Sequence, residues 1–136
     1  MPVQVPRRLS RFDLSMFDAA CKQDFPIDER AKRTRFPFRL LRYWTASCAI
    51  LEETRAVPPP HVLVDLGCER GLLKRFMPPA RTIRWIGLDA RPCEEDLRSV
   101  GYPERHRCDF DREFPLPDAV ADIVAALHVF EHLPRP

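Results

Sequence analysis

Long apolar runs are missing from this 136-residue chain, and its five cysteines include no C-x-x-C pair. No stretch approaches the roughly 18–20 apolar residues that a membrane-spanning helix needs. No apolar segment follows the N-terminal arginines, as it would in a secretory signal. The odd number and the spacing of the cysteines indicate neither a zinc site nor a disulfide framework. We therefore expect a cytoplasmic protein with reduced thiols and no membrane partner.

A strong charge of one sign is also missing, because the formal net charge is only +2. That charge is too small to indicate nucleic-acid binding by itself. The chain is 45% hydrophobic and 31% charged, a balance typical of globular rather than disordered proteins. Much of the positive excess lies between Arg30 and Arg42. We interpret it as a solvated helix face with its preceding loop; the alternative is a patch for an anionic substrate or RNA.

Fifteen prolines divide the chain into short elements, since proline removes a backbone donor and disfavours helix before it. Residues 1–36 give weak signals, with a short helical turn expected around 12–17. The spacing of the apolar residues predicts one amphipathic helix over 37–56, ended by three prolines. The stripe of that helix consists of Leu40, Leu41, Trp44, Cys48 and Leu51.

Beyond residue 60 short apolar runs alternate with helical patterns. The predicted strands are 61–66, 82–88, 105–108 and 121–127, and the predicted helices are 71–77, 92–100 and one that begins at Val129. This rhythm is typical of a parallel α/β sheet. We therefore predict an N-terminal helical or irregular segment over 1–60 and a Rossmann-like α/β domain over 61–136. Ligands bind such sheets outside the carboxyl ends of the strands.

The strongest motif is the run VDLGCERG at 64–71, where a strand enters a tight turn before a helix. Glycine permits positive φ and the close approach of a ligand. The G-x-G-x-x-G fingerprint of dinucleotide-binding proteins is absent. The run resembles motif I of class I S-adenosylmethionine-dependent methyltransferases, written around D-x-G-x-G-x-G. Asp65, Gly67 and Gly71 match that motif, and Glu69 stands at the place of its middle glycine.

Four later segments resemble the same family, the last two of them its type 11 group, so that the resemblance covers residues 61–136. Asp89 ends the second predicted strand, and Asp109 with Phe110 ends the third. For Asp89 the resemblance implies a bond to the ribose hydroxyls, and for Asp109 and Phe110 contacts to adenine. The stretches FPLPD…ADIV at 114–124 and LHVFEHL at 127–133 are similar to segments around the family's fourth strand.

The resemblance implies S-adenosyl-L-methionine as cofactor and methyl transfer to an acceptor, for which we favour a small molecule. The implied cofactor-binding residues are Asp65, Gly67, Glu69, Gly71, Asp89, Asp109 and Phe110. The catalytic residues are unknown, and His128, Glu131 and His132 are the only candidates for a base. The same residues form H-x-x-E-H, a zinc-peptidase pattern. We predict no metal there, because prolines follow at once and a third ligand is missing.

The family fold has seven strands, whereas the predicted ones end with the fourth. The apolar run over 123–127 in the fourth predicted strand is typical of a buried central strand. An exposed sheet edge at this strand would favour aggregation. We therefore expect a fragment of a longer protein. The alternatives are a partner or second copy that covers the fourth strand, or residues 1–60 folded across it. The rival to an enzyme is a non-catalytic fragment or interaction module that keeps the half-domain.

Overall fold

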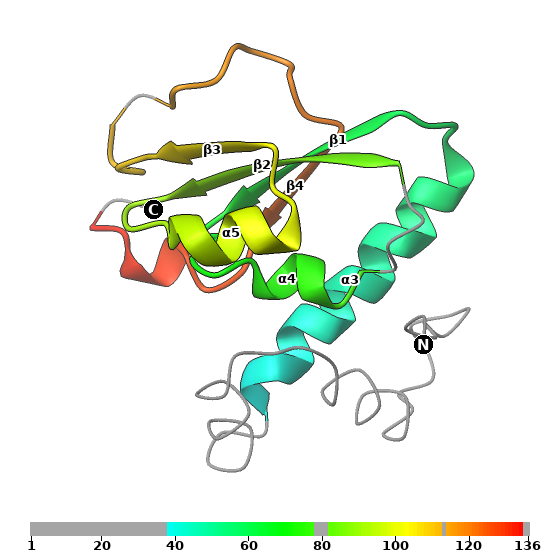
Figure 1. The fold of residues 1–136 in the computed structure, drawn as a ribbon, viewed down its shortest axis with the longest axis horizontal. Helices are drawn as coiled ribbons and strands as arrows, with labels where there is room; N and C mark the ends of the chain where they lie inside the picture. The colour runs from blue at the N-terminus through cyan, green and yellow to red at the C-terminus, as the bar shows by residue number, and fades with distance from the viewer. Residues whose placement is uncertain (1–37, 78–81, 113, 135–136) are drawn as a thin grey trace. The chain divides into compact units, whose positions relative to one another are not determined.

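The computed structural model describes residues 38–77, 82–112 and 114–134, whose course is shown in Figure 1. The helical turn expected around 12–17 lies outside the described residues. The chain forms two compact units: one contains helices α3 and α4, and the other contains the sheet, α5 and the 3-10 helix η1. The predicted division of the chain at residue 60 stays a prediction. No described helix is both long and apolar enough to cross a bilayer.

The first unit is helical. The helix predicted over 37–56 is confirmed as α3 (Phe38–Ala56). Four residues of its predicted stripe are buried and Leu41 is half-buried, while Tyr43, Ser47 and Ile50 are buried outside the stripe. Helix α4 (Leu72–Arg75) contacts α3 and is a single turn, shorter than the helix predicted over 71–77. Its end is tight, because the next two N–H groups bond to carbonyl oxygens three residues back.

The second unit is a parallel four-stranded sheet in the order β3-β2-β1-β4, which confirms the predicted Rossmann-like α/β fold. The strands are β1 (His61–Leu66), β2 (Ile83–Asp89), β3 (Glu104–Arg107) and β4 (Ile123–Ala126). The chain steps outward from β1 through β2 to β3 and then returns to the other side of β1. Open sheets bind ligands where the strand order reverses in this way, here between the carboxyl ends of β1 and β4.

Helix α5 (Glu94–Val100) is stabilised by acidic residues in its first turn and by hydrogen bonds at its C-terminal end. Its first turn carries three acidic residues, which interact favourably with the positive end of the helix dipole. At its end the N–H groups of Gly101 and Tyr102 both bond to the carbonyl oxygen of Leu97, at 3.1 and 3.0 Å. This closure directs Tyr102 inward, where it is 1% exposed and contacts Trp85 edge to face at 5.4 Å between ring centroids.

Alternation along the strands gives the sheet two unlike faces. One face carries Asp65 and Gly87, which lie opposite each other in the register of β1 and β2, and α5 covers it (Figure 1). The other face carries the apolar cluster of Val64, Leu66 and Leu88. Described residues of the loop between β3 and β4 pack against that second face, namely Phe110, Leu116, Val120 and Ala121.

The fourth strand begins later than predicted, because Asp122 is tied to β1 through its side chain. The Asp122 carboxylate accepts the Val62 N–H at 2.7 Å, and the Asp122 N–H donates to the Val62 carbonyl oxygen at 2.9 Å. Among the described residues β4 pairs only with β1, and Val124 is 60% exposed. The interpretation of this run as buried throughout is therefore wrong for Val124, which lies on the face that carries Val64 and Leu66.

Candidate functional site

The turn after β1 is anchored on β2. The N–H groups of Gly67 and Cys68 donate to the carbonyl oxygen of Leu88, at 2.8 and 3.3 Å, so that the chain leaves β1 across the end of β2. The Gly71 N–H then closes back onto the Cys68 carbonyl oxygen at 2.6 Å. The turn is thus a compact loop at the carboxyl edge of the sheet, where the sequence predicts a ligand site.

Every second residue of this turn, from 67 to 71, has a left-handed backbone conformation. Gly67, Glu69 and Gly71 have φ values of +73°, +41° and +72°, in the region that favours glycine. Glu69 therefore takes a glycine-like conformation at the place where motif I has its middle glycine. A glutamate in this region is strained by about 1 kcal/mol or more. Its side chain is exposed, so that a carboxylate stands at the rim of the turn.

The need for glycine is sharpest at position 67. A Cβ atom there would lie 2.6 Å from Cγ2 of Val129, the buried residue that precedes η1 (Phe130–His132). Atoms this close repel strongly, in addition to the strain that φ of +73° imposes on other residues. This contact brings the segment after β4 against the turn after β1, and so both sides of the strand-order reversal meet at Gly67.

Asp89, at the end of β2, fastens the turn. Its Oδ2 accepts the Glu69 N–H at 2.9 Å, and its Oδ1 accepts the Arg91 N–H at 2.7 Å. The Glu69 carbonyl oxygen accepts the Cys93 N–H at 2.9 Å, which ties the turn to the start of α5. A carboxylate has about four lone-pair positions. The half-buried Asp89 can therefore hold the turn and still accept hydrogen bonds from a ligand diol.

Asp65 differs from the other acids, because it is only 3% exposed. The Tyr102 hydroxyl donates to its Oδ2 at 2.6 Å. Burial raises the pKa of Asp65 from 3.8 to about 7, the Tyr102 hydrogen bond opposes the rise, and the nearby Asp89 charge adds to it. Asp65 thus lies beneath the turn rather than on its surface.

Burial dominates at Cys68 as well. It raises the pKa of the Cys68 thiol, and the charges of Asp65, Asp89 and Glu94 raise it further. The thiol is therefore neutral and acts as a packing group. Three acidic side chains thus lie near the Cys68 thiol, and their charges favour a ligand that carries positive charge.

Asp109 and Phe110 follow β3, one residue beyond Cys108, whose N–H donates to the Asp89 carbonyl oxygen at 2.9 Å. The Asp109 carboxylate is exposed, accepts the Asp111 N–H at 3.1 Å and pairs with Arg112 at 3.3 Å. Phe110 is half-buried against the apolar cluster of the sheet. The ends of β2 and β3 are therefore adjacent, as the sequence analysis expects of ligand-binding strand ends.

The three base candidates lie on the segment after β4. His128 has φ of +56° and precedes the single 3-10 turn that holds Glu131 and His132, so that the two histidines are not on an α-helix. His128 Nδ1 lies 2.7 Å from the Glu131 carboxylate, and all three side chains are exposed. Within the described ranges no cluster of three or more histidine, cysteine or acidic residues is arranged to hold a metal ion.

Most of the predicted residues meet at one edge. Glu69 and Asp89 are joined directly, Gly67 contacts the segment that follows His128, and Asp109 follows the strand next to Asp89. Tyr102, the donor to Asp65, is not among the residues predicted from the sequence. Its only signal is its place after Gly101, where a large aromatic residue follows a helix-ending glycine.

Comparison with known proteins gives no significant relative, because no protein-family model, curated protein or solved structure matches the chain.

Proposed function

We propose that the carboxyl edge of the sheet binds S-adenosyl-L-methionine and that the chain takes part in methyl transfer, as its motifs suggest. The observation that carries this proposal is the bond between the Glu69 N–H and the Asp89 carboxylate. It joins a turn with three left-handed residues to the acid at the end of the neighbouring strand. This pairing of a close-approach turn with a diol acceptor suits a nucleoside ligand.

The charge of the edge supports a nucleoside that carries a cation rather than phosphates. The exposed Glu69 carboxylate stands at the rim of the turn, where a dinucleotide would place its pyrophosphate. Asp89 adds a second negative charge that is bonded to the same turn. A sulfonium with an ammonium group is complementary to these charges, whereas a pyrophosphate is repelled.

Different residues of this edge would make different contacts with the cofactor. Asp89 would accept hydrogen bonds from the ribose hydroxyls through its remaining lone pairs, while its present bonds keep the turn in place. Gly67 keeps the turn close to Val129 and leaves the loop without a side chain at that point. Phe110 would offer an apolar surface to adenine. Asp65 acts from beneath, by holding Tyr102.

S-adenosylmethionine would supply a methyl group activated by its sulfonium, which a nucleophile of the acceptor would displace, with S-adenosylhomocysteine as the neutral thioether that leaves. The protein then contributes mainly proximity and orientation. A base is needed only where the acceptor loses a proton as it attacks. His128 is the best placed of the three candidates, because a bond from Nδ1–H to Glu131 leaves Nε2 as the proton acceptor.

Calorimetric titration with S-adenosylmethionine, and competition by S-adenosylhomocysteine, test the binding directly. We expect saturable binding to the parent chain at or below millimolar ligand. Asp89→Ala should weaken it by roughly 10- to 100-fold, because charge-assisted hydrogen bonds contribute about 1.5–3 kcal/mol. Glu95→Ala removes an exposed acid of α5 and serves as the matched control, with unchanged affinity expected.

Glu69→Gly tests whether the shape of the turn or its negative charge holds the ligand. Glycine suits φ of +41° and restores the motif, so that we expect S-adenosylmethionine to bind at least as well as to the parent. Loss of binding in this variant would mean that the carboxylate, rather than the shape of the turn, holds the ligand. Absence of heat and of competition in the parent at millimolar ligand contradicts the proposal as a whole.

A binding role without turnover is the second candidate, favoured by two exposed apolar side chains near β4. Val124 and Phe130 are 60% and 55% exposed, values more typical of an interaction surface than of a free strand end. Binding of S-adenosylmethionine with no transfer of a labelled methyl group to amine, hydroxyl or thiol acceptors would favour this role.

A further inference from the structure

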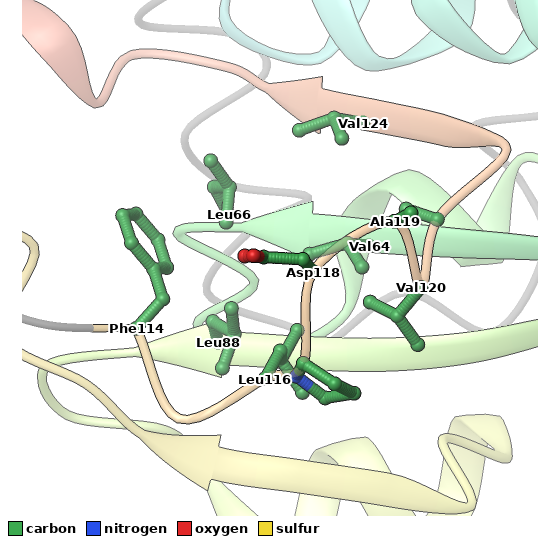
Figure 2. Close-up of a pocket in the computed structure, with 11 residues that line it drawn as sticks. Val64, Leu66, Leu88, Phe114, Leu116, Asp118, Ala119, Val120 and Val124 are labelled. Carbon is green, nitrogen blue, oxygen red and sulfur yellow. The ribbon is translucent and has the colours of Figure 1, made fainter.

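A cavity of about 380 Å³ lies on the sheet face that α5 does not cover (Figure 2). Four strand residues form its floor, and the loop before β4 forms its wall. The floor consists of Val64, Leu66, Leu88 and Val124. The wall consists of Phe114, Leu116, Pro117, Asp118, Ala119, Val120 and Ala121. Its volume lies at the lower end of the range for small-molecule sites, about 300–1,000 Å³.

The wall of the cavity is fixed in place. At its end, Asp122 bonds to both main-chain groups of Val62, at 2.7 and 2.9 Å. Leu116 and Val120 pack against the apolar cluster of the sheet. Ala119 is held at φ of +58°, a conformation that costs a non-glycine residue energy. A ligand would thus enter a largely preformed space, which reduces the ordering that binding requires.

Asp118 is the only charged residue among the described side chains that line the cavity. In the view of Figure 2 its carboxyl group projects between Leu66 and Leu88, in the direction of Phe114. Residues 109–122 contain five acidic residues and one arginine, which gives a net charge of −4. That arginine, Arg112, pairs with Asp109 at 3.3 Å. The cavity therefore combines an apolar floor with a single carboxylate in its wall.

We infer that this cavity binds a small molecule with an apolar, preferably aromatic, body and one protonated amine, with Asp118 as the counter-ion. The aliphatic floor takes the body. Phe114, which is 44% exposed and lies 5.9 Å from Phe110 between ring centroids, offers it an aromatic partner. The amine satisfies Asp118, which no cation faces among the lining residues. The inference does not depend on methyl transfer, because none of the lining residues belongs to the proposed cofactor site.

Three probes of one shape test the inference on the 136-residue chain: phenethylamine, 2-phenylethanol and 3-phenylpropionate. Chemical shifts of the valine and leucine methyl groups report where each probe binds. We expect phenethylamine to shift the methyl groups of Val64, Leu66 and Val124 and to bind roughly 10-fold more tightly than the alcohol, since its bond to Asp118 is charge-assisted. The carboxylate probe should not bind.

Matched variants locate the charge. Asp118→Asn should reduce the affinity for phenethylamine to that of 2-phenylethanol, whereas Asp111→Asn, an equal loss of charge outside the lining, should change it less than about 2-fold. Val124→Trp fills the open side of the cavity and should weaken the binding of both phenethylamine and 2-phenylethanol. Because Asp118 and Val124 are exposed, these variants should keep the parent's melting temperature within a few degrees.

Several results overturn the inference. Equal affinity for the three probes, or equal effects of Asp118→Asn and Asp111→Asn, removes the role of Asp118. Binding that leaves the methyl groups of the floor unshifted places the ligand elsewhere. A concentration-dependent dimer that Val124→Trp dissociates, with no amine bound, shows that a second copy covers this face. Asp89→Ala should leave amine binding unchanged, so that failure here and failure at the cofactor site are distinguishable.

Discussion

The two faces of the sheet differ in how closely their side chains are packed. On the face under α5, the side chains of Cys68 and Tyr102 approach Gly87 so closely that a Cβ there would lie 2.9 and 3.1 Å from them. On the other face a cavity of about 380 Å³ remains beneath a loop, and Val124 is 60% exposed. The first face holds a buried acid and is closely packed around Gly87, whereas the second is apolar and holds a cavity.

This difference in packing predicts which substitutions alter stability and which alter binding. Close-packed interiors respond to the addition of a single carbon atom. A loosely covered apolar face tolerates changes of size but offers a surface on which other molecules bind. We therefore expect substitutions on the α5 face to alter stability, and substitutions on the open face to alter binding.

The largest expected effect concerns Asp65 and pH. Its pKa rises from 3.8 in the unfolded chain to about 7 in the folded one, so that the folded protein binds this proton more tightly. The resulting stability is fully present below pH 3.8 and is lost as the pH rises through about 7. The shift corresponds to at most roughly 4 kcal/mol, at about 1.4 kcal/mol for each unit.

Asp65→Asn removes this titration. We expect the variant to be more stable than the parent at pH 8, by roughly 2–4 kcal/mol, and to differ much less at pH 5. Urea denaturation at the two pH values measures both numbers. Tyr102→Phe should act in the opposite direction, because it removes the donor to the carboxylate. A parent chain whose stability does not fall between pH 5 and pH 8 would contradict the burial of Asp65.

Gly87→Ala is expected to have the next largest effect. Its Cβ would meet Cys68 Sγ at 2.9 Å, within a packed face, so that we expect a loss of roughly 1–3 kcal/mol in urea denaturation. Cys68→Ala should relieve the contact, and the double variant should be more stable than the sum of the single effects predicts. Strict additivity would show that Cys68 is not the obstacle.

The sequence predicted the strands well because each is a short run whose residue pattern is local. The α/β class, the helix of Leu40 and Trp44, and the strand that ends in Asp65 all follow from periodicity and from proline positions. The motif also placed Glu69 and Asp89 at one edge, since parallel strands end together.

The sequence could not predict features that depend on contacts across the fold. Tyr102 reaches Asp65 over 37 positions, and no local pattern announces that bond. Asp122 shortens β4 by bonding to Val62, a distance of 60 positions along the chain. The exposure of Val124 depends on what covers the sheet, whereas its local run is typical of a buried strand.

Val124→Thr provides the smallest expected effect and the sharpest comparison with Gly87→Ala. Threonine keeps the branched shape of valine and its preference for strands, and its hydroxyl remains accessible to water because the site is 60% exposed. We therefore expect a change in unfolding free energy within about 0.5 kcal/mol. The same hydroxyl makes the floor of the cavity more polar, so that phenethylamine should bind more weakly although stability is unchanged. A loss of stability as large as that of Gly87→Ala would mean that this face is as closely packed as the one under α5.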